Sequence, residues 1–151
     1  MASKTETAGV PNIYKMFGTS PKKETEGIVL NYSDLFWLRA ARAGGANETY
    51  KKVLTEITRP YRRAIQTETI SPEMVTKLMR EAAARGLVLA WGSKQYGDGF
   101  MPDKDGSRMD FSVENVVKFF ENLPDIFLDF QEQTGKVSLF IAGELEEDAK
   151  N

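Results

Sequence analysis

The segment Leu35-Phe-Trp-Leu-Arg-Ala-Ala-Arg-Ala-Gly-Gly-Ala-Asn47 decides the fold, because a strand pattern ends in it and a helix begins directly after it. Apolar and polar residues alternate over 27–40, which predicts a β-hairpin. Gly44 and Gly45 give the backbone freedom for a sharp change of direction, and the Asn47 side chain can accept hydrogen bonds from the free N–H groups of the following helix. These three residues are expected to form a structural joint, although an ordinary strand-to-helix connection uses the same residue types.

The composition indicates one domain and excludes most catalytic chemistry. With 151 residues, of which 41% are hydrophobic and 28% charged, the chain has the length of a single domain and can bury a core. It contains no Cys and no His, which removes disulfides, thiol nucleophiles, imidazole bases and the common zinc ligand sets. We therefore expect a protein that is not an enzyme and that uses no cofactor and no metal.

The ends of the chain differ in composition from its middle. Residues 1–11 are rich in Ser, Thr, Lys and Glu and are predicted to be a flexible tail, and the acidic residues 144–151 are predicted to be a second one. Residues 12–143 are expected to form a single domain, in which residues 18–23 are a turn that leads to the hairpin. The longest apolar run, residues 87–91, is too short to cross a membrane. We expect a cytosolic protein with no membrane partner.

Helical patterns dominate after the two glycines. Apolar residues keep helical spacing from Asn47 to Ile65, and Pro60 is expected to bend this helix because it lacks a backbone donor. The segment Ser71-Pro72-Glu73 is typical of a helix start. The apolar face of this second helix is expected to continue as far as Leu89.

Two more helices are predicted after a segment rich in Gly and Asp. Residues 91–110 are expected to be a long loop or two short extended pieces around a turn. Part of this segment imitates a calcium-binding loop, but Met and Ser stand where that loop has acidic ligands, so a β-turn is expected instead. Asp110 and Ser112 precede the third helix, and Pro124 starts the fourth, whose pattern extends to Phe140. The predicted fold class is α+β, mainly α, with an N-terminal β-hairpin packed on a bundle of about four helices.

Several short motifs resemble those of the tail assembly chaperone family of long-tailed bacteriophages. They stand in the same order and at similar separations as in that family, and they are Glu26-Gly-Ile-Val-Leu-Asn-Tyr32, Arg39-Ala-Ala-Arg-Ala-Gly-Gly-Ala-Asn47, Asp110-Phe-Ser-Val-Glu-Asn115 and Leu123-Pro-Asp-Ile-Phe127. The resemblance covers about residues 17–140. It implies a small, non-enzymatic protein of the host cell cytoplasm that binds the tape-measure protein before and during assembly of the tail tube and usually leaves before the virion is complete.

The resemblance also raises the question of a longer form. In that family a programmed frameshift often gives a minority of copies an additional domain for contact with the major tail (tube) protein, and a slippery run of adenines could encode Lys150-Asn151. An ordinary acidic tail followed by a stop is the alternative. Two competing hypotheses for the whole protein are a structural tail or neck component that stays in the virion, and a host-directed or nucleic-acid-binding phage protein.

The aromatic residues of the last two predicted helices are candidate partner-binding residues. Apolar residues cover more of the circumference of these helices than one core-facing stripe needs. One interpretation is that each helix is sandwiched between two others. The other interpretation is that the helices present an apolar groove to an amphipathic segment of a partner. In the second case the binding residues are Phe119, Phe120, Phe127 and Phe130.

Charge is distributed unevenly along the chain. Residues 39–63 have a net charge of +5 and residues 110–148 a net charge of −8, while the whole chain has −2. Arg59, Arg62 and Arg63 are the candidate binding cations. Two interpretations apply: solvated faces whose exposed ion pairs each contribute about 0–1 kcal/mol, or head-to-tail self-association between basic and acidic helices. A pI of about 5.3 and the lack of interleaved aromatic residues argue against a nucleic-acid partner.

Overall fold

The computed structural model of the chain describes residues 12–142. Its helices are α2 (Ile13–Phe17), α3 (Pro21–Glu26), α4 (Glu48–Thr58), α5 (Arg62–Gln66), α6 (Pro72–Gly86), α7 (Val113–Asn122) and α8 (Pro124–Thr134), with the 3₁₀ turns η1 (Arg59–Tyr61) and η2 (Val137–Phe140). Its strands are β1 (Ile28–Tyr32), β2 (Phe36–Ala40), β3 (Val88–Ser93), β4 (Gly97–Asp98), β5 (Phe100–Pro102) and β6 (Arg108–Asp110). The fold is α+β and mainly helical with an N-terminal hairpin, as the sequence predicts. The predicted tails, and Lys150-Asn151 with them, lie outside the described residues.

The predicted hairpin is present and belongs to a four-stranded antiparallel sheet. β1 and β2 pair over their whole length, with Leu30 opposite Leu38. The strand order is β1-β2-β3-β4, and β5 pairs with β6 in a separate two-stranded sheet. The β-turn predicted from the calcium-like segment joins β5 to β6, and in it the N–H of Gly106 donates to the carbonyl of Asp103 at 2.9 Å.

β3 is the main difference from the sequence prediction. The sequence predicts a helical face as far as Leu89, but α6 ends at Gly86 and β3 then pairs with β2. Residues 87–91 form a short apolar run, and such a run fits a buried strand as well as a helix. The hydrophobic pattern of this segment therefore does not distinguish the two structures.

Two shorter segments also differ from the prediction. Residues 18–23 are predicted to be a turn, but Ser20 instead caps α3, whose first residue is proline. A capping serine followed by a proline at the first helical position also begins α6, where the helix start at Ser71 is predicted correctly. The last helix is predicted to extend to Phe140, but α8 ends before Gly135, a residue type common just after helices, and η2 follows as a separate turn.

The helix starts and the bend agree with the prediction. The side chains of Asn47, Ser71 and Ser112 each accept a hydrogen bond from the backbone N–H three residues later. These bonds satisfy donors that the first turn of a helix leaves free. At Pro60 the chain turns from α4 through η1 into α5, because proline has no N–H for a helical hydrogen bond.

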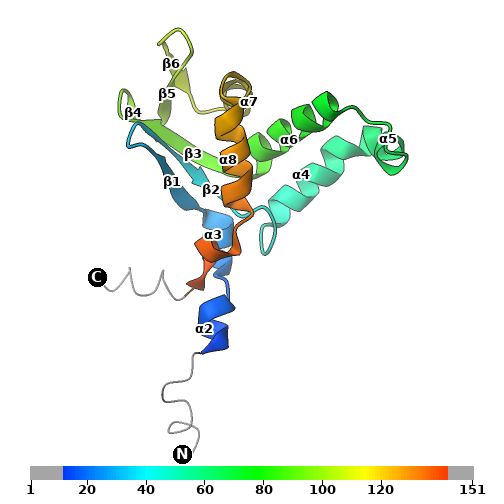
Figure 1. Ribbon diagram of the computed structural model, residues 1–151. Helices are drawn as coiled ribbons and strands as arrows, with labels where there is room; N and C mark the ends of the chain where they lie inside the picture. The colour runs from blue at the N-terminus through cyan, green and yellow to red at the C-terminus, as the bar shows by residue number, and fades with distance from the viewer. Residues whose placement is uncertain (1–11, 143–151) are drawn as a thin grey trace, which may run out of the picture.

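One helix pair projects from the body of the molecule. Figure 1 shows α7 and α8 beside the sheet, while the segment from α4 to α6 extends away from the body as an arm with α5 at its far end. Leu38 of β2 and Trp91 of β3 are buried in the same core as Val116 of α7. No helix in the described part of the chain is both long enough and apolar enough to cross a membrane.

The two ends of the described chain lie together. Thr19 and Ile141 form an antiparallel bridge, and the N–H of Ser20 donates to the carbonyl of Phe140 at 2.8 Å. The ammonium group of Lys23 donates to the carbonyl of Ile141 at 2.9 Å. The segment after α8 is therefore fastened to the segment before the hairpin.

Candidate partner-binding surfaces

The four candidate phenylalanines belong to the core. Phe120 and Phe130 are completely buried, and Phe119 and Phe127 are 5% and 3% exposed. α7 packs against α6, α8 and the sheet, where the ring of Phe119 lies 5.4 Å from that of Phe36. Its apolar residues therefore cover more than one side of the helix. The expectation that these four rings form an exposed groove is wrong, and the sandwiched arrangement is the one that the structure has.

A groove nevertheless opens beside this core, and Phe119 lines it. The groove has a volume of about 460 Å³, and its apolar lining includes Leu35, Phe36, Met101, Phe119 and Leu123. Leu35 is 60% exposed and Leu123 is 41% exposed. Large apolar side chains at the surface often mark a binding site when they stand together. We name this feature the Leu35–Leu123 groove.

Neither exposed leucine is among the binding residues that the sequence predicts. Leu35 follows a tight turn in which Ser33 and Asp34 have φ values of 54° and 58°. Leu123 stands between two helices, directly before Pro124. Leu35 belongs to no helical or strand repeat, so periodicity gives no signal for it, whereas Leu123 keeps helical spacing with Val116 and Phe120, a pattern that does not separate a buried from an exposed side chain. A large apolar residue at a turn was the available signal.

A second hollow lies on the face of the sheet that includes Val29 and Trp37. Its volume is about 570 Å³, and Arg39 and Asp98 line it as well, so it carries charges of both signs. The Trp37 indole lies over Gly92 of the neighbouring strand, where a Cβ would overlap the ring. The absence of a side chain at Gly92 therefore makes room for the Trp37 ring, which lines the hollow.

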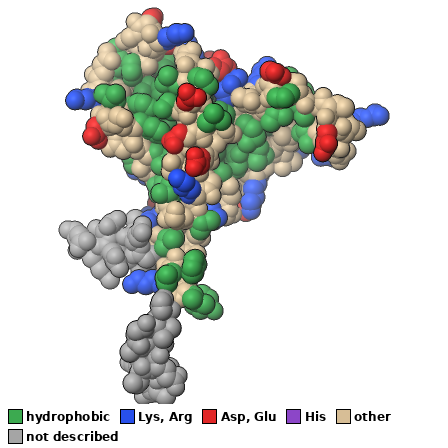
Figure 2. All heavy atoms as spheres, in the orientation of Figure 1, with side chains coloured by type: hydrophobic (Ala, Val, Ile, Leu, Met, Phe, Trp, Pro, Cys, Tyr) green, Lys and Arg blue, Asp and Glu red, His purple; other side chains and the backbone are tan. Residues whose placement is uncertain are grey.

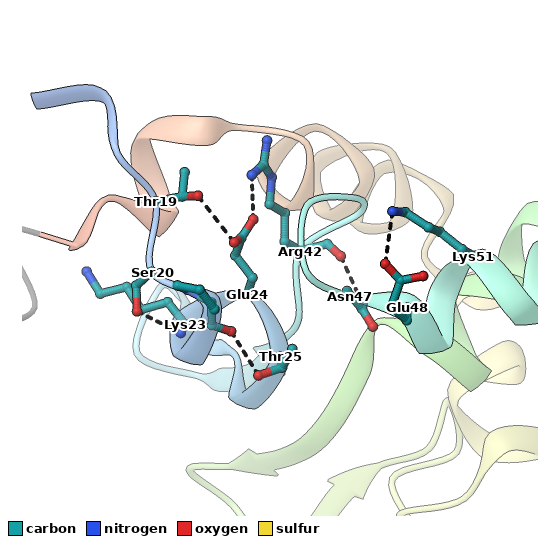
Figure 3. Close-up of polar contacts among 10 residues, drawn as sticks. Thr19, Ser20, Lys23, Glu24, Thr25, Arg42, Asn47, Glu48 and Lys51 are labelled. Atoms are coloured by element: carbon teal, nitrogen blue, oxygen red, sulfur yellow. Dashed lines mark hydrogen bonds and ion pairs between the residues drawn. The ribbon is translucent and has the colours of Figure 1, made fainter. Parts of the chain in front are cut away.

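An ion pair between Glu24 and Arg42, drawn in Figure 3, lies against the glycine joint. The φ angle is +143° at Gly44 and +54° at Gly45, a region that residues with a Cβ rarely adopt. A Cβ on Gly45 would overlap the carboxylate of Glu24. That carboxylate is buried and accepts a hydrogen bond from the guanidinium of Arg42. The missing side chain at Gly45 thus makes room for the ion pair.

Hydrogen bonds connect this joint with several elements. The hydroxyl of Thr19 donates to the carboxylate of Glu24 at 3.2 Å (Figure 3). The side-chain amide of Asn47 donates to the carbonyl of Arg42 at 2.9 Å and to the carbonyl of Gly86 at 3.0 Å. The helix α3, the segment after β2, the start of α4 and the end of α6 therefore meet here.

The candidate cations lie far from the aromatic core. Arg59, Arg62 and Arg63 are exposed on η1 and α5, at the far end of the arm (Figure 1). None of the three forms an ion pair within residues 12–142. The structure therefore separates the candidate cations from the candidate aromatic residues and does not combine them in one site.

Two shifted pKa values report contacts between elements. Burial and the nearby carboxylate of Asp129 raise the pKa of Tyr32 above its ordinary value. A hydrogen bond from Lys118, whose Nζ lies 2.6 Å from Oδ2, lowers the pKa of Asp103 below its usual range. Among the described residues, no group of three or more acidic side chains is arranged to hold a metal ion. The raised pKa of Tyr32 therefore reflects its contact with α8, and the lowered pKa of Asp103 reflects its contact with α7.

Comparison with known proteins gives the origin of the chain. A family model described as YdaY prophage protein matches residues 45–151, which is more than two thirds of the chain. The match begins in the glycine joint and includes the arm and both C-terminal helices, and the hairpin precedes it. A search of curated proteins and a search of solved structures each gave no match. The chain is therefore derived from a phage and belongs to the YdaY prophage protein family.

Proposed function

We propose that the chain is a phage tail assembly chaperone, which binds the tape-measure protein and keeps it soluble until tube subunits replace the chaperone. Membership of a prophage family supports a function in a phage, and the motif resemblance supports a function in tail assembly. The observation that carries the proposal is the Leu35–Leu123 groove, which offers an apolar surface to a partner. In this proposal the protein works by binding alone, in the host cytoplasm, and leaves before the virion is complete.

The groove suits an amphipathic helical segment. The resemblance implies a client that is long and mainly helical, and such helices dock by placing apolar residues of one face into an apolar groove. Leu35 and Leu123 stand at the surface, where they can contact the sides of the client helix. Phe36, Met101 and Phe119 lie deeper and can receive its side chains. Covering the apolar face of the client would prevent its aggregation.

Co-purification with the tape-measure protein tests the groove. The double variant Leu35→Ser/Leu123→Ser should bind the client at least about tenfold more weakly, because full burial of each leucine side chain is worth roughly 1.5–3 kcal/mol. Its melting temperature should change little, since both side chains are exposed in the free protein. Val75→Ser is the matched control, because Val75 is 41% exposed on α6 and does not line the groove. Equal binding by the double variant and the control would contradict the proposed site.

A structural tail or neck component is the second candidate function. The exposed charged surfaces at the arm and on α8 favour it, because permanent subunit contacts can use the same surfaces. Mass spectrometry of purified virions separates the two candidates. Many retained copies of the chain would contradict the chaperone proposal, and absence of the chain from the virion would support it.

A further inference from the structure

The far end of the arm has the composition of one half of an interface. Ile65 of α5 is 41% exposed, and Arg62 lies one helical turn before it on the same side of the helix. Arg59 and Arg63 are exposed beside them. We name these four residues the basic tip. An apolar centre with a charged rim is the usual arrangement of a protein–protein contact.

The outer face of α8 has the same arrangement with the opposite charge. Leu128 is 62% exposed, and Asp125 and Glu132 lie three residues before it and four residues after it, on the same side of the helix. Both acidic residues are exposed, and Figure 2 shows acidic side chains gathered over this part of the molecule. We name these three residues the acidic face of α8.

The basic tip and the acidic face cannot meet within one molecule. Figure 1 shows the arm extending away from α8, with α5 at the end that is farthest from the body. Their complementary charges therefore point to contact between molecules. We propose that the occupant of the acidic face of α8 is the basic tip of a second copy of this chain. The proposal is independent of client binding at the Leu35–Leu123 groove.

This contact is heterologous, because it joins two different surfaces of the same chain. After the first contact the pair of copies keeps one free tip, on one copy, and one free acidic face, on the other, so the assembly continues until it closes into a ring or grows as a filament. Because the rims of both surfaces are charged and exposed, association should be strong at low ionic strength and weak at high ionic strength.

Charge reversal with mixing tests the proposal by sedimentation velocity. The wild-type chain should form oligomers at about 0.01 M salt, where the Debye length is about 30 Å, and should dissociate at about 1 M salt, where it is about 3 Å. The variants R59E/R62E/R63E and D125K/E132K should each associate at least about tenfold more weakly than the wild type, because each has two surfaces of the same sign. An equimolar mixture of the two variants should associate again, since each then meets an opposite charge.

The control reverses cations that lie elsewhere. K22E/K94E/K104E changes the net charge by the same amount as the arm variant and affects exposed lysines outside the arm. It should associate like the wild type. The proposal is overturned if the wild-type chain is a monomer at low ionic strength, if the control loses association as the arm variant does, or if the mixture fails to associate. Circular dichroism of each variant confirms that it is folded.

Discussion

At the scale of single residues, the glycine joint depends on the side chain that Gly45 lacks. Its Cβ position is occupied by the carboxylate of Glu24, which is buried and paired with Arg42. Gly44 also has a positive φ, but no atom outside its two neighbours in the chain lies within 4 Å of its Cβ position. The two glycines therefore differ: substitution strains the backbone at both positions, and it also displaces a buried charge at Gly45.

Gly45→Ala should consequently destabilise the fold more than Gly44→Ala. We expect a loss of about 1–3 kcal/mol from backbone strain at either position, and a further loss at Gly45 because the ion pair must move. Urea unfolding of both variants measures the difference. In a Glu24→Ala/Arg42→Ala background the additional loss at Gly45 should disappear. If the two glycine variants are equally stable in the parent chain, the ion pair does not depend on the space at Gly45.

At the scale of elements, one ion pair fastens the small β5–β6 sheet to α7. Asp103 lies at the turn of this hairpin, and its Oδ2 lies 2.6 Å from Nζ of Lys118 on α7. The backbone N–H of Lys104 also donates to Asp103, at 2.6 Å. Both hydrogen bonds favour the charged carboxylate and lower its pKa. The hairpin that lies near the Leu35–Leu123 groove is therefore held in place partly by charge.

Lys118→Met should raise the pKa of Asp103 toward its ordinary value. Because the pKa is lower in the folded chain than in the unfolded chain, the ion pair stabilises the fold above the unfolded-state pKa of Asp103. This stabilisation is lost as the pH falls through the folded-state pKa. An NMR titration of the Asp103 carboxyl carbon measures the change directly. Lys104→Met is the control, because only its backbone N–H contacts Asp103, and the titration of that variant should match the wild type.

The sequence predicts those elements that carry their own local signal. The hairpin follows from alternation, the bend from Pro60, and the helix starts from the capping residues at Asn47, Ser71 and Ser112. β3 could not be predicted in the same way, because a short apolar run is compatible with a strand or a helix until its neighbour β2 is in place.

The candidate site was harder to predict than the fold. The apolar residues of α7 cover more than one face of the helix, and this pattern is compatible both with burial on two sides and with an exposed binding groove. Only the packed structure separates these two cases. Leu35 and Leu123 lie at turns, where exposure depends on how the neighbouring elements pack. The charges of Arg59, Arg62 and Arg63 were visible in the sequence, but their distance from α8 required the three-dimensional arrangement.

At the scale of the whole molecule, the two ends of the arm differ in how many residues they bury. α5 at the tip has no buried residue, whereas the C-terminal half of α6 has several next to the body. Few buried contacts and many exposed backbone hydrogen bonds favour local opening. The tip can therefore adjust its shape on contact with a partner, while the base of the arm keeps its orientation.

Hydrogen exchange should show this gradient along the arm. The amides of residues 62–66 should open with a free energy at least about 2 kcal/mol lower than that of residues 82–86. Mass spectrometry or NMR of the exchanging chain at low concentration measures both segments in one experiment. Similar protection of the two segments would show that the arm opens as one unit. At high concentration and low salt, contact through the basic tip should slow exchange at residues 62–66.

The pairing of the two ends of the described chain has a topological consequence. Since Thr19 bridges Ile141, sequence joined after Ala142 and sequence joined before Asn12 both leave the molecule from the region around α2 and α3, away from the far end of the arm (Figure 1). A translation product lengthened at its C-terminus would carry its additional domain on that side. Fusion partners attached there would leave both the arm and the groove unobstructed, and a short linker between the ends would allow circular permutation of the fold.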